Sequence, residues 1–158
     1  MTLTIELSRV SPTRHRMQLR RADGSCESFE LETRSCLLHD LVHFAVESEA
    51  GLRASFYGRL ARGASYESLA AVDIAAADSG ELAQVEQVVG PLQSGWRRGA
   101  DPSAVFDRMR SYFAELGQTG PAWLDEGLVQ RVWSRLRQLE GHWRATPFGE
   151  VMQLTFLS

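Results

Sequence analysis

The fold is decided by residues 2–32, which read TLTIELSRVSPTRHRMQLRRADGSCESFELE. Polar and apolar residues alternate over three segments of this stretch, residues 2–8, 15–21 and 26–32. Such alternation is typical of strands that have one buried face. Asp23-Gly24 supplies the positive φ that a tight hairpin turn needs. The stretch therefore predicts a three-stranded antiparallel meander whose apolar face must be covered by helices.

Helical patterns follow the meander. Helices are predicted over residues 35–50, 53–62, 78–89, 101–116 and 121–140, whereas 65–77 stays open between helix and loop. Alternation returns over residues 151–157, which predicts a strand that joins the N-terminal sheet. The fold class is therefore α+β: a small antiparallel sheet of three N-terminal strands plus a C-terminal strand, covered by about five helices, in one domain over residues 1–158.

Single residues mark the predicted helix boundaries. Ser35 is the expected N-cap of the first long helix. Gly90-Pro91 is expected to kink or end the helix that begins near residue 78. Asp101 followed by Pro102 is a strong start signal, and Pro121 is expected to open the last helix.

Composition excludes several classes of chemistry. The chain has 158 residues and contains no lysine, because all 17 basic residues are arginine. Schiff-base catalysis and a Walker-type phosphate loop are thereby excluded. The net charge of −3 lacks the basic excess of a duplex-binding domain, so no nucleic-acid partner is expected. The chain has two cysteines and no signal-peptide pattern, which predicts a reduced cytoplasmic protein. It has no apolar run of about 18 residues, so no membrane span is expected. A homo-oligomer stays open.

The chemistry-bearing segment is residues 36–47, CLLHDLVHFAVE. On a helix that advances about 100° per residue, His39, Asp40, His43 and Glu47 share one arc of about 100°, and apolar residues fill the rest of the circumference. Two histidines at i and i+4 can share one ion, and zinc takes imidazole nitrogens and carboxylate oxygens. Glu47 can be a third ligand or can hydrogen-bond a ligating histidine. The segment predicts a zinc site with ligands His39, His43 and Glu47.

Two other interpretations of this polar stripe stay open. The histidines can form a structural, hydrogen-bonded pair in a non-enzymatic interaction or regulatory domain that binds no metal. They can also serve a metal-free catalytic or ligand-binding site. Of the other histidines, His15 lies between two arginines and is expected to be exposed, and His142 is expected at a capped helix end.

His39-Asp40-Leu41-Val42-His43 resembles the His-Glu-x-x-His helix of zincin metallopeptidases, with Asp in place of Glu. That resemblance covers about nine residues and implies that His39 and His43 bind zinc and that Asp40 is the general base of a hydrolase. Asp is one methylene shorter than Glu, which reduces its reach toward a reacting water. A wider resemblance is to a bacterial protein family of unassigned function. It rests on the segment from His39 to Glu47, on Phe56-Tyr57-Gly58 and on the N-terminal hairpin.

Overall fold

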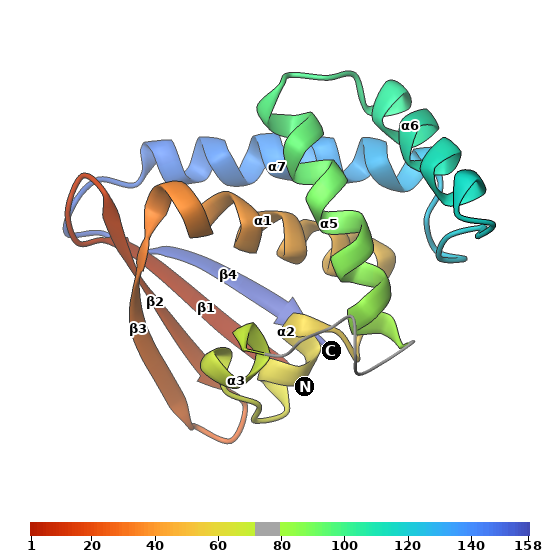
Figure 1. Ribbon diagram of the computed structural model, residues 1–158. Coiled ribbons are helices and arrows are strands. Elements are labelled where there is room, and N and C mark those ends of the chain that lie inside the picture. Colours follow the sequence, from red (N-terminus) through yellow and green to blue (C-terminus); the bar gives the residue numbers. More distant parts are fainter. Residues whose placement is uncertain (72–79) are drawn as a thin grey trace.

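A four-stranded antiparallel sheet forms one side of the molecule in the computed structural model, which describes residues 1–71 and 80–158 (Figure 1). The strands are β1 (Thr2–Arg9), β2 (Arg14–Arg21), β3 (Cys26–Glu32) and β4 (Met152–Leu157). The helices are α1 (Thr33–Ala50), α2 (Phe56–Ala61), α3 (Tyr66–Ala70), α5 (Glu81–Arg97), α6 (Pro102–Glu115) and α7 (Glu126–Ala145). The predicted α+β fold is confirmed.

The sheet has the strand order β3-β2-β1-β4, so the C-terminal strand joins the meander as predicted. Leu3 and Ile5 of β1 pair with residues of both neighbouring strands and are 0% and 1% exposed. Between β2 and β3, Gly24 has φ +87°, which is the positive φ that the Asp-Gly turn predicted.

Helix α1 lies between the sheet and the helices α5 and α7, and α6 is farther out, packed on α5 and α7 (Figure 1). Because α1 has neighbours on both sides, most of its circumference is buried, as its composition indicated. This central position places the histidines of α1 against α5. No helix among the described residues combines the length and hydropathy that a membrane crossing requires.

Several predicted helix boundaries are wrong. Helix α1 begins at Thr33, and the Ser35 hydroxyl donates to Glu32 instead of capping the helix. Helix α5 continues through Pro91, because buried residues on both sides of the proline hold its two halves against the same core. Helix α7 begins after Asp125, whose carboxylate accepts from the Leu128 N–H at 2.7 Å, and not at Pro121.

Other predicted boundaries agree with the structure or concern residues that the structure does not describe. Asp101 caps α6 through the Ser103 N–H at 2.9 Å, as predicted. The open segment 65–77 contains the short helix α3, and its part from residue 72 onward lies outside the described residues. The same holds for residues 78 and 79, at the predicted start of the next helix, and the N-cap of α5 is Gly80.

The expectation that His15 is exposed is wrong. Its side chain is 0% exposed, because β2 turns it toward the core, where its ring contacts Trp143 edge-on at 5.9 Å. The Nδ1 atom is 3.0 Å from the Thr33 hydroxyl, and Nε2 has no partner among the described residues. Burial, with a contribution from the charge of Arg14, lowers the pKa of His15 to about 4.

Candidate metal centre

The two histidines of α1 meet a carboxylate of α5. His39, His43 and Glu86 each offer one ligand atom, and these atoms all lie within 4.8 Å of one another. The two imidazole rings have centroids 4.9 Å apart, as the i, i+4 spacing on one helix predicts. Ligand atoms about 2.1 Å from a tetrahedral zinc lie about 3.4 Å apart, so small side-chain rotations would bring these three into range.

His43 lies between two carboxylates. Its Nδ1 is 3.1 Å from Glu47 Oε2, and its Nε2 is 3.0 Å from Glu86 Oε1. Burial lowers the pKa of His43, but the hydrogen bonds and charges of Glu47 and Glu86 outweigh that effect and raise it to about 9. Burial raises the pKa of Glu86, whereas the hydrogen bond and charge of His43 lower it below its ordinary value, and the lowering prevails. In the absence of a metal, this geometry favours an imidazolium with a carboxylate at each nitrogen.

Glu47 is fully buried and is held at both oxygens. Oε2 contacts His43, and Oε1 accepts from the backbone N–H of Tyr57 at 2.8 Å, in the first turn of α2. A carboxylate is favourable there because the N–H groups of a first helical turn have no partner within the helix. Of the two roles expected for Glu47, the hydrogen bond to a candidate ligand is present. The three-residue group contains Glu86 in place of Glu47.

The other histidine, His39, is partly exposed and is oriented by α5. Its Nδ1 is 3.0 Å from Gln93 Oε1. Because that oxygen is an acceptor, Nδ1 is the donor in this contact, and a neutral ring with this tautomer has its lone pair at Nε2, where a ligand can bind. Gln93 follows Glu86 by seven residues, or about two turns, so both side chains lie on the face of α5 that meets α1.

Asp40 has a different environment from the three grouped residues. It is 2% exposed, and its carboxylate accepts from the Tyr66 hydroxyl at 3.2 and 3.4 Å. Burial raises the pKa of Asp40 to about 7, although the charge of His43 and the Tyr66 hydrogen bond act in the opposite direction. The Tyr57 hydroxyl donates to the Asp40 carbonyl at 3.0 Å. The role of Asp40 as general base stays a prediction.

The sequence did not indicate Glu86 or Gln93. Both lie more than 40 positions from His43 along the chain, and Gln93 lies beyond residue 89, where its helix was predicted to end. The available signal was weak: two polar residues seven positions apart beside the buried face of an amphipathic helix. His142, by contrast, lies in the last turn of α7, where its carbonyl accepts from the Thr146 hydroxyl at 2.7 Å.

No protein-family model matches this chain, and no curated protein and no solved structure matches it either. The resemblances to zincins and to a bacterial family therefore stay predictions. The case for a function depends on the geometry of the residues themselves.

Proposed function

We propose that this protein binds a divalent transition metal, zinc in the first place, through His39, His43 and Glu86. Two imidazole nitrogens and one carboxylate oxygen are a donor set that zinc accepts, and three protein ligands leave a further coordination position open. The observation that carries the proposal is the hydrogen bonding of the two imidazole rings. In each, Nδ1 lies 3.0 or 3.1 Å from a side-chain oxygen, from Gln93 or Glu47.

Such hydrogen bonds are typical of ligating histidines, because they fix the ring orientation and the tautomer. They direct the metal to Nε2, and Nε2 of His43 is already 3.0 Å from Glu86. A zinc ion would bind between these atoms and displace the proton from His43. The Glu86 carboxylate would turn from a hydrogen-bond acceptor into a ligand.

Charge balance also supports a divalent ion. Glu47 and Glu86 bring two negative charges to one histidine, and the Glu47 side chain has no exposed surface. A proton on His43 offsets one of these charges, whereas a divalent cation offsets both. Buried charge that lacks compensation is costly, so the site has a physical reason to prefer the metal.

A hydrolytic role is the finer part of the proposal. Zinc bound by three protein ligands supplies Lewis acidity at its open position. Asp40 would hold or accept a proton beside the site, and its pKa of about 7 is suited to proton transfer at neutral pH. Replacing Asp40 by Asn should leave zinc content unchanged and abolish any hydrolysis that wild type shows. Lost zinc content would give Asp40 a role in binding instead.

A second candidate is a metal-free interaction or regulatory domain. One observation favours it: both nitrogens of His43 already have a carboxylate partner, at 3.1 and 3.0 Å, which satisfies an imidazolium without any ion. Under this alternative the triad of His43, Glu47 and Glu86 is a largely buried link between α1 and α5, and its loss changes stability or partner binding only.

The deciding experiment is elemental analysis of tag-free protein, followed by zinc titration of metal-depleted protein. About one equivalent of zinc, with release of about one proton from His43, is expected at neutral pH. His39→Ala and Glu86→Gln should lose the metal, whereas His142→Ala, which removes a histidine at the end of α7, should keep it. Both ligand positions are partly exposed, so these variants should fold. Wild type that holds less than a tenth of an equivalent, even after zinc is added, would reject the proposal.

A further inference from the structure

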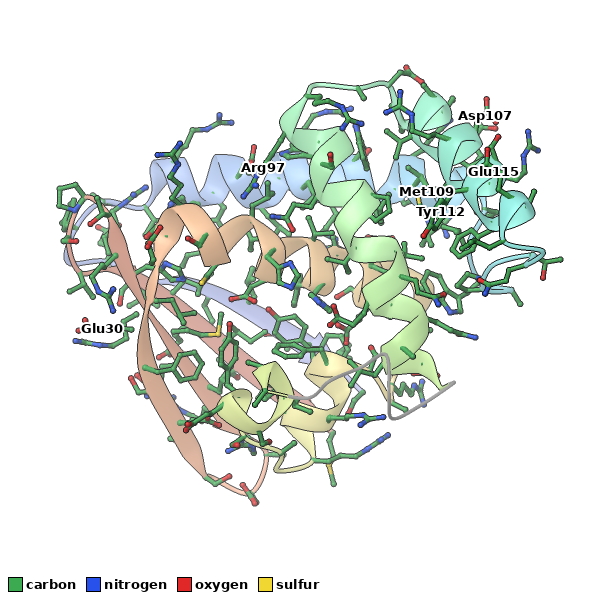
Figure 2. All side chains as sticks on the ribbon, in the orientation of Figure 1. Glu30, Arg97, Asp107, Met109, Tyr112 and Glu115 are labelled. Carbon is green, nitrogen blue, oxygen red and sulfur yellow. The ribbon has the colours of Figure 1, made fainter. Side chains whose placement is uncertain are left out.

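A cavity of about 250 Å³ lies between α5 and α6, away from the candidate metal centre. Its apolar lining comes chiefly from α6, where Val105, Met109 and Phe113 are 3–5% exposed. Tyr112 stands at its rim and is 54% exposed. Figure 2 shows Met109 and Tyr112 on the side of α6 that faces α5, whereas Asp107 lies on the outer side.

The α5 wall of this cavity is a stripe with helical spacing: Gln87, Pro91, Ser94 and Arg98. At about 100° per residue these four fall within about 60° of one another, and Glu86 and Gln93 lie about 100° away around the helix. One helix therefore presents separate faces to the candidate metal centre and to the cavity. Binding at one does not require the other.

The charge of the lining has one sign. Two arginines, Arg98 and Arg108, line the cavity, and no carboxylate in the described part of the chain does. Within residues 1–71 and 80–158, neither guanidinium forms an ion pair with a carboxylate, and Arg98 donates to the Ser94 hydroxyl at 2.6 Å. The whole chain has a net charge of −3, so a concave apolar site with two arginines that no carboxylate of the described residues neutralises is selective for an anionic ligand. It fits a ligand with an apolar body and an anionic group.

We propose that this cavity binds a small amphipathic monocarboxylate, with an unbranched chain of about eight carbons. Arg98 and Arg108 hold the carboxylate, because a guanidinium donates two parallel hydrogen bonds to its two oxygens. The hydrocarbon chain of the ligand lies on Val105, Met109 and Phe113. A volume of about 250 Å³ lies near the small end of the range for ligand pockets, so the ligand must be small.

Polar ligands fit this lining less well. Apart from the arginines, the polar side chains of the lining are Gln87, Ser94 and the Tyr112 hydroxyl. A sugar or nucleotide would leave several of its own polar groups without partners against the apolar wall, and each unpaired group costs affinity. A fatty acyl chain or a simple apolar acid has no such groups beyond its carboxylate.

Calorimetric titration of the whole protein with sodium octanoate tests this assignment. One site is expected, and hexanoate should bind about tenfold more weakly, because two methylenes leave the apolar wall. Octylammonium should not bind detectably. Arg98→Gln and Arg108→Gln should each weaken octanoate at least tenfold. The matched control Arg110→Gln removes an arginine from the same helix outside the cavity, and should bind as wild type.

A further variant tests where the hydrocarbon chain of the ligand lies. Ser94 is exposed on α5 and lines the cavity, so Ser94→Phe should fold normally and abolish binding by filling it. Either of two results would overturn the proposal: no octanoate binding at millimolar concentration, or binding that octylammonium or the Arg108→Gln variant matches. The ligand does not contact His39, so His39→Ala should bind octanoate normally whether or not the protein holds a metal.

Discussion

Replacing Glu47 by Gln tests how the carboxylate beneath His43 controls the candidate metal centre. Glu47 accepts two hydrogen bonds, from the Tyr57 backbone N–H at 2.8 Å and from His43 Nδ1 at 3.1 Å. Gln has nearly the same shape but only one acceptor oxygen. A backbone N–H can only donate, so the amide oxygen must stay at Tyr57. The amide NH₂ then faces His43 Nδ1 and forces the ring proton to Nε2.

That tautomer removes the lone pair that a metal needs. We expect the zinc affinity of Glu47→Gln to fall about 10- to 100-fold, the usual cost of losing the hydrogen-bond partner of a ligating histidine. In free energy this is about 1.4–2.7 kcal/mol. The assay is competition with a chromophoric zinc chelator at neutral pH, with circular dichroism and urea unfolding to verify the fold.

Glu49→Gln is the matched control for this change. Glu49 lies on the same helix, and its carboxylate pairs with Arg135 at 2.8 Å, away from the histidines. Both variants remove one negative charge from α1, so a general electrostatic effect would weaken zinc binding in both. Our reasoning is refuted if folded Glu47→Gln binds zinc as wild type does, or if Glu49→Gln loses as much affinity.

Three further predictions concern stability. The pKa of His15 is about 4 in the folded state and about 6.5 when unfolded, so on acidification the unfolded chain takes up the proton first. The contribution of the neutral, buried His15 ring to the free energy of unfolding is therefore complete above about pH 6.5, and it is lost as the pH falls toward 4. Between pH 8 and pH 5, urea unfolding should show wild type losing about 2 kcal/mol more than His15→Leu, and equal losses would contradict the burial argument. Gly58→Ala should lower the free energy of unfolding by about 3 kcal/mol, because a Cβ there would lie 2.5 Å from the Arg53 carbonyl carbon. A thermal unfolding midpoint equal to that of wild type would show that this backbone can move. Asp101→Ala removes the side-chain cap of α6 and should cost about 1 kcal/mol by the same urea assay, whereas Asp101→Asn should restore most of it.

Much of the fold could be predicted because its signals are local. The alternation over the first 32 residues is enough for three strands, since each side chain in a strand points away from its neighbours in sequence. The cap at Asp101 fixed the start of α6. A local rule failed at Pro91, where the helix does not end because burial of the flanking residues outweighs the lost hydrogen bond. At His15 the alternation of β2 was sufficient, since it puts His15 on the buried face with Met17 and Leu19, and the wrong expectation of exposure came from the two flanking arginines.

The candidate site also has a part that local spacing predicts and a part that only tertiary packing creates. The i, i+4 spacing by itself placed His39 and His43 side by side on α1, because helix geometry fixes the distance between such neighbours. Glu86 and Gln93 joined them only through the packing of α5 against α1, which brings together residues far apart in the chain. Periodicity identifies the face that a helix buries, but it carries no information on which distant helix will cover that face. Tertiary packing therefore decided the third member of the group and the partner that orients His39.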